Sequence, residues 1–126
     1  MKPQFSEDGH IINKDAVIKD EIRKLNAQFA DIPEKQKAVA ESVIRSDSFQ
    51  TVNMLELESI LNIKGFVEGY QNGANQYGLK ESSEARSYIN LAKTHLAYRK
   101  HLNNLLPKGS TPVDDGFDDF IGGREN

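Results

Sequence analysis

The chain has 126 residues, of which 37% are apolar and 28% are charged, and its formal net charge is −3. This length suits one domain, and the low apolar share allows only a modest core that oligomerisation would help to stabilise. The absence of cysteine excludes disulfides, thiolate metal sites and cysteine nucleophiles. No apolar run exceeds three residues, so we expect no signal peptide, no membrane span, and a soluble, cytoplasmic protein.

The predicted fold class is mainly α, with a small helical domain of about four helices over residues 14–106. Residues 1–13 are polar, and we expect them to form a flexible arm. Apolar residues at helical spacing then predict a first helix over about 13–30.

Two shorter helices are expected next. The first covers about residues 33–45, where a proline suits the helix start. Ser46-Asp47-Ser48 predicts a break and a new N-cap. The second covers roughly residues 50–64, and Gly65 ends it.

Residues 66–79 predict a short β-hairpin or an ordered loop. Gly69, Gly73 and Gly78 would each cost about 1 kcal/mol inside a helix. Asn72-Gly73 favours a tight two-residue turn, because both residue types tolerate the positive φ angles that such a turn needs.

The last predicted helix is the longest. Ser82 or Ser83 caps it, and Pro107 stops it after about Leu106. Its apolar arc spans roughly 200°, which fits either a central helix or a helix that also packs against a second subunit. His95 and Arg99 lie within this arc and need a partner, a wet interface or an extended path to the surface. The candidate oligomer interface is Tyr88, Leu91, His95, Tyr98, Arg99 and Leu102.

The sequence carries no recognisable catalytic pattern. His10, His95 and His101 have no metal-ligand spacing, and there is no phosphate-binding glycine loop, dinucleotide fingerprint or Gly-x-Ser-x-Gly elbow. We therefore expect a protein that is not an enzyme and uses no metal, cofactor or small-molecule substrate.

Two groups of basic residues are candidates for DNA binding. Lys19, Arg23 and Lys24 lie on the first helix, where interleaved acidic residues also favour a solvated, salt-bridged face. Arg86, Lys93 and Lys100 form a cleaner stripe along the last helix. No recognition helix stands out, so phosphate contacts would dominate any binding to DNA.

Residues 107–126 form an acidic tail that we expect to be disordered when free. Three apolar residues in it share the spacing of one helix face, which favours a docking motif over a merely solubilising tail. The candidate docking residues are Asp114, Asp115, Phe117, Asp118, Asp119, Phe120 and Ile121.

Five segments carry a family resemblance through their order and spacing. They are Ile32-Pro33-x-x-x-Lys37, Leu55-Glu56-Leu57 with Gly65, Tyr70-Gln71-Asn72-Gly73-x-Asn75-Gln76-x-Gly78-x-Lys80-x-Ser82, Leu105-Leu106-Pro107-Lys108 and Asp114-Asp115-Gly116-Phe117-Asp118-Asp119-Phe120. From about residue 25 to 121, the chain resembles the terminase small subunits of tailed phages from Gram-positive hosts.

The resemblance implies a helical, non-enzymatic DNA-packaging subunit in the cytoplasm of an infected or lysogenic bacterial host. Such subunits assemble into rings, bind double-stranded phage DNA at the packaging site, and recruit and regulate the large terminase subunit. The tail would then dock the large subunit. One alternative is a phage-encoded adaptor or inhibitor that binds a host protein through this tail and does not bind DNA. A weaker alternative is a scaffold-type protein that oligomerises without DNA.

Overall fold

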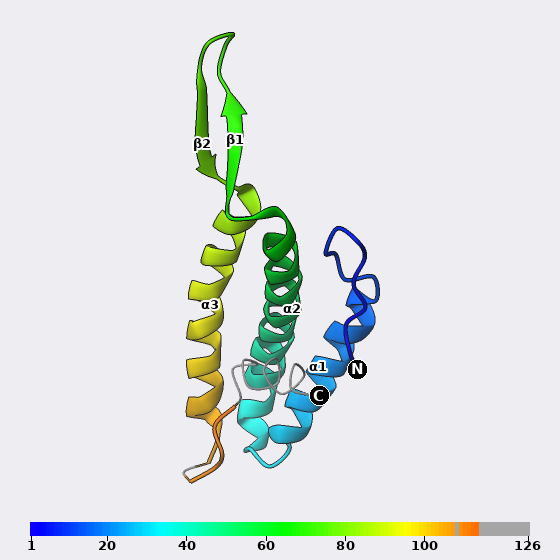
Figure 1. Ribbon diagram of the computed structural model, residues 1–126. Helices are drawn as coiled ribbons and strands as arrows, with labels where there is room; N and C mark the ends of the chain where they lie inside the picture. The colour runs from blue at the N-terminus through cyan, green and yellow to red at the C-terminus, as the bar shows by residue number, and fades with distance from the viewer. Residues whose placement is uncertain (108, 114–126) are drawn as a thin grey trace.

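The computed structural model describes residues 1–107 and 109–113 and confirms a mainly helical fold with a two-stranded antiparallel hairpin (Figure 1). Helices α2 and α3 run side by side, and α1 packs on the other side of α2. The hairpin projects from the end of the α2–α3 pair, away from the turn that joins α1 to α2. The elements are α1 (Lys14–Gln28), α2 (Glu34–Lys64), β1 (Val67–Gln71), β2 (Tyr77–Glu81) and α3 (Ser83–Leu105).

The expected break at Ser46-Asp47-Ser48 is wrong, because α2 runs through it without interruption. Asp47 and Ser48 are both fully buried, and the Asp47 carboxylate binds Arg99 of α3 instead of capping a new helix. The described residues therefore form three helices, and the two short helices expected over residues 33–64 are one.

The other helix boundaries follow local chemistry. Gly65 ends α2 with a φ of +89°, and its N–H donates to the Leu61 carbonyl at 2.7 Å. Ser82 caps α3 by accepting a hydrogen bond from the Ala85 N–H at 3.1 Å. Of the two serines considered, the cap is thus Ser82. None of the helices in the described residues is long and apolar enough to cross a bilayer.

Residues 1–13, expected as a flexible arm, form a hook that packs on α2. Phe5 and Ile11 form an antiparallel bridge, and the Ile11 N–H donates to Glu56 Oε2 at 2.9 Å. Gly9 has a φ of +92°, and a β carbon there would lie 3.0 Å from the backbone of Ile60. Glycine therefore permits both the turn and its close approach to α2.

The core is divided into two clusters along α2. One joins the ends of α1 and α3 to the first half of α2, and the other joins the hook and the start of α1 to the middle of α2. The buried members of the first are Leu25, Phe29, Ile32, Ala40, Ile44, Leu102 and Val113. Those of the second are Ile11, Val17 and Val52.

Candidate interaction surfaces

The hairpin has five residues in each strand and a five-residue connection. Val67 pairs with Glu81 at its base, and Gln71 pairs with Tyr77 near its tip. Gly73 has the expected positive φ, +87°, but Asn72 does not. The predicted two-residue turn is therefore wrong, because residues 72–76 form a longer loop, closed by an Asn72 N–H to Gln76 carbonyl bond of 2.8 Å.

One face of the hairpin is filled by its own side chains. The ring of Tyr70 lies over Gly78, its cross-strand partner. Beside it, Glu68 pairs with Lys80 at 3.5 Å and with Lys64 of α2 at 3.6 Å. Both the apolar and the charged groups of this face thus have contacts within the chain.

The opposite face carries three exposed apolar side chains, beside the polar Gln71 and Glu81, and no element covers it in the described residues. Side chains of cross-strand partners share a face, so this one carries Val67, Tyr77 and Leu79. Their exposures are 54%, 75% and 78%. Leu79 stands opposite Gly69, so no cross-strand side chain shields it. We call these three residues the hairpin apolar face.

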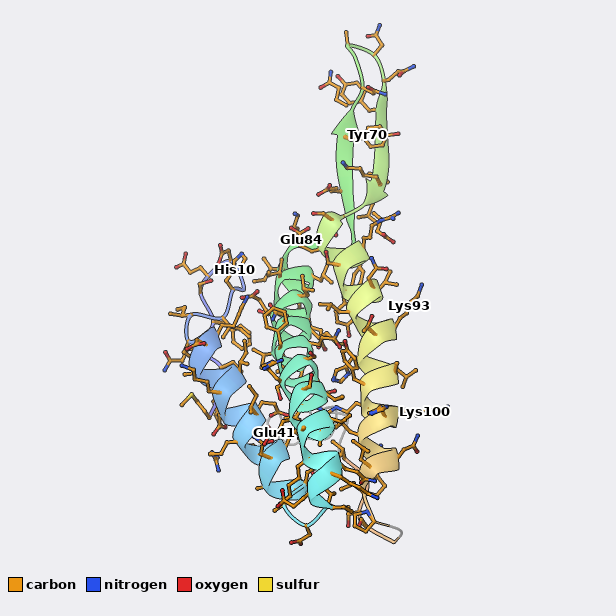
Figure 2. The ribbon with its side chains drawn as sticks, turned by 180° about the vertical axis from the view of Figure 1, so that it is seen from behind. His10, Glu41, Tyr70, Glu84, Lys93 and Lys100 are labelled. Atoms are coloured by element: carbon orange, nitrogen blue, oxygen red, sulfur yellow. The ribbon has the colours of Figure 1, made fainter. Side chains whose placement is uncertain are left out.

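The outer face of α3 carries basic side chains that have few acidic neighbours. Lys93 and Lys100 point away from the helices, as Figure 2 shows, and neither forms an ion pair within residues 1–107 and 109–113. Arg86 lies 3.6 Å from Glu81 with 79% of its side chain exposed. The single acidic residue of α3, Glu84, is bound to Lys64 at 2.9 Å.

The basic residues of α1 are all in ion pairs. Lys19 pairs with Asp15 at 2.9 Å, while Arg23 and Lys24 lie 2.9 and 3.3 Å from Asp20. The N-terminal ammonium group and Arg23 hold the pKa of Asp20 well below its usual range. These contacts therefore favour the interpretation of α1 as a helix with a solvated, salt-bridged face.

The six candidate interface residues of α3 divide into two groups. His95, Arg99 and Leu102 are buried within the chain, where they face α2 or the core. Tyr88, Leu91 and Tyr98 are half-buried. Only the second group remains accessible to another molecule.

His95 and Arg99 belong to a buried polar cluster between α2 and α3. The guanidinium of Arg99 donates to Asp47 Oδ1 at 3.0 Å, and its Nη2 forms an ion pair with Asp47 Oδ2 at 2.9 Å. The Arg99 guanidinium also donates to Thr51 Oγ1 at 3.2 Å, and Thr51 Oγ1 lies 2.8 Å from His95 Nε2. Glu21 of α1 lies 3.7 Å from the same guanidinium.

Burial raises the pKa of Asp47 from an ordinary 3.8 to about 6, although Arg99 opposes the shift. This cluster ties α3 to α2 through polar contacts and offers no open site. His95 and Arg99 thus have polar partners within the chain. The partner that the sequence did not reveal is Asp47, because it was predicted to lie in a break between two helices.

A hollow of ≈ 400 Å³ lies on the α2–α3 pair and was not expected from the sequence. Its lining is aromatic and polar: Arg45, Ser46, Phe49, Gln50 and Tyr98. Phe49 is 55% exposed, and neither aromatic residue belongs to a core cluster. Phe49 follows the mispredicted break, so no helical register was predicted that would place its side chain on a face of α2.

The described residues contain no group of three or more acidic or histidine side chains placed to hold a metal ion. The candidate docking residues 114–121 lie outside the described residues. Comparison with protein-family models, with curated proteins and with solved structures finds no match.

Proposed function

We propose that this chain is a DNA-packaging accessory protein of the small-terminase type. It would form a homo-oligomer, bind double-stranded phage DNA, and recruit and regulate the large terminase subunit. The proposal starts from the resemblance in the sequence, and the outer face of α3 is the observation that carries it. We assign to residues 114–121 the role of binding the large subunit, because of their acidic and aromatic pattern.

The outer face of α3 has the charge and the spacing of a phosphate-binding surface. Arg86, Lys93 and Lys100 are seven residues apart, so they share one face at intervals of about 10 Å. The basic side chains of α1 are weaker candidates for phosphate binding, because each already forms an ion pair: Lys19, Arg23 and Lys24. Binding would be non-specific in its contacts and sensitive to salt, since each neutralised phosphate releases counterions.

Oligomerisation would multiply this modest surface. Three basic side chains on one copy give weak binding, but several copies held together act on one DNA duplex with a higher effective concentration. The uncovered hairpin apolar face is consistent with a chain that associates, because exposed apolar patches mark interaction surfaces.

The test is DNA binding by fluorescence anisotropy over a salt series, with the oligomeric mass followed by light scattering. We expect the full chain to bind a labelled duplex, with log K falling linearly against log[salt]. Lys93→Ala and Lys100→Ala should each weaken binding and reduce the slope by about 1 per copy engaged. Lys35→Ala, an exposed change of the same charge at the start of α2, is the matched control.

Two outcomes would overturn the proposal. One is no binding to DNA at low salt. The other is binding that Lys35→Ala weakens as much as Lys93→Ala and Lys100→Ala do. A monomer that does not bind DNA would instead favour an adaptor that acts through its tail.

A further inference from the structure

The hairpin is a free-standing two-stranded sheet with one unfilled face. A lone hairpin of this length is marginally stable in water unless a third element packs on it. Its filled face already has Tyr70 on Gly78 and the Glu68 pairs. Within residues 1–107 and 109–113, no element covers the other face, where Tyr77 and Leu79 are both at least 75% exposed.

The hollow on the α2–α3 pair is a second surface with exposed aromatic side chains. Phe49 and Tyr98 give it an aromatic lining, while Arg45 places a positive charge at it. The hairpin apolar face ends in a carboxylate, because Glu81 is the cross-strand partner of Val67. The Glu81 side chain remains 45% exposed beside Arg86. Apolar groups and opposite charges are thus available on both surfaces.

The two surfaces cannot meet within one chain. Lys64 lies fifteen positions after Phe49 in α2, a distance of about 22 Å along the helix, and the hairpin continues away from that end (Figure 1). A contact between them must therefore join two copies.

We propose that the hairpin apolar face of one copy seats in the hollow of the next, around Phe49 and Tyr98. This inference rests on the homo-oligomer of the proposed function and identifies the surfaces that build it. The contact is head to tail, because each copy gives a hairpin and receives one at a different place. Such contacts close into a ring when the rotation between copies permits it.

The test uses one variant for each surface. Leu79→Asp with Tyr77→Ser alters the hairpin, and Phe49→Glu alters the hollow. All three side chains are more than half exposed, so the fold should persist, which circular dichroism checks. Leu96→Asp is the matched control, because Leu96 is 73% exposed on α3 and belongs to neither surface. Leu79→Ser provides a milder hairpin variant.

We expect the wild-type chain and Leu96→Asp to be oligomers by light scattering, and both surface variants to have the 14.1 kDa mass of one chain. An equal mixture of the two variants should form a heterodimer, because one copy retains an intact hairpin and the other an intact hollow. A wild-type monomer, an oligomer that survives Leu79→Ser and the hairpin double variant, or a mixture that stays monomeric would each overturn the inference.

DNA binding separates this inference from the proposed function. A wild-type oligomer that binds DNA but ignores the surface variants would remove the inference and leave the function. Variants that dissociate an oligomer without affinity for DNA would support the inference and remove the function.

Discussion

The ring of Tyr70 lies over Gly78, and a β carbon on that glycine would stand 2.7 Å from three atoms of the ring. The two residues are cross-strand partners, so the missing side chain of one makes room for the ring of the other. Gly69 and Leu79 form the next pair, but there the space beside the glycine is empty. One face of the hairpin is therefore packed, because Gly78 leaves room for the Tyr70 ring. The other face is unpacked, because Gly69 has no side chain to contact Leu79.

Gly78→Ala should weaken the hairpin, because the added methyl group must displace the Tyr70 ring. Since the ring is the flexible end of a half-exposed side chain, we expect a local cost of about 1 kcal/mol, at the low end for overpacking. This is a loss of about fivefold in hydrogen-exchange protection at the Asn72 and Ser82 amides, whose bonds flank the strands.

Gly69→Ala is the matched control for this prediction. A β carbon at position 69 meets nothing closer than the Gly78 carbonyl oxygen at 4.0 Å. It should therefore leave protection unchanged or raise it, because alanine restricts the unfolded chain. Equal losses in the two variants would mean that the Tyr70 ring does not rest on Gly78.

Ser82→Ala should lower the free energy of unfolding by about 1 kcal/mol, since it removes the side-chain cap of α3. The Ser82 side chain is fully buried, and its hydroxyl has the Ala85 N–H as its partner. Ser83→Ala removes only an exposed bond to Glu84 and should change stability little. Urea unfolding of both variants measures the difference. A larger loss of stability in Ser83→Ala than in Ser82→Ala would mean that Ser83, and not Ser82, caps α3.

Local signals predicted the elements of this fold where they did not compete with tertiary contacts. The cap at Ser82, the stop at Gly65 and the hairpin between them follow from residue types that suit those positions. Ser46-Asp47-Ser48 has the composition of a cap as well. The helix nevertheless continues there, and the Asp47 carboxylate binds Arg99, 52 residues away, instead of capping a helix. No local pattern contains that partner.

The positions of the candidate surface residues were predicted in part. The spacing of Arg86, Lys93 and Lys100 placed them on one face of a helix, and the structure leaves this face outward. The apolar arc of α3 was too wide to predict which of its residues pack inside the chain. In the structure Leu102 is buried, whereas Tyr98 is half-buried. The strand register decides which side chains share a face of the hairpin. This register is set by a loop that is longer than the predicted two-residue turn.

Arg99→Met should cost about 3–5 kcal/mol of unfolding free energy at neutral pH, because it leaves the buried Asp47 carboxylate without a cation. Arg23→Met removes an exposed pair with Asp20 and should cost no more than about 1 kcal/mol. Chemical denaturation at pH 7 compares the two. Similar small losses would show that Arg99 and Asp47 do not form a buried pair in solution.

The pH dependence of stability provides a separate test of Asp47. Its folded pKa, about 6, lies above its ordinary 3.8, so between these values the native state holds a proton that the unfolded chain has lost. The contribution of Asp47 is thus fully present below about pH 4 and is lost as the pH rises to about 6. Its size is about 3 kcal/mol, since each unit of pKa is worth about 1.4 kcal/mol.

Asp47→Asn isolates this contribution, because the rest of the chain titrates in both proteins. The stability of the aspartate protein relative to the asparagine variant should fall as the pH rises from about 4 to about 6, and then level off. Arg99 and Glu21 face the carboxylate and are unchanged in the comparison. Histidine side chains ionise in the same range, so both proteins carry His95→Gln. A difference that stays constant, or rises with pH, would mean that the Arg99 charge outweighs burial and keeps Asp47 ionised.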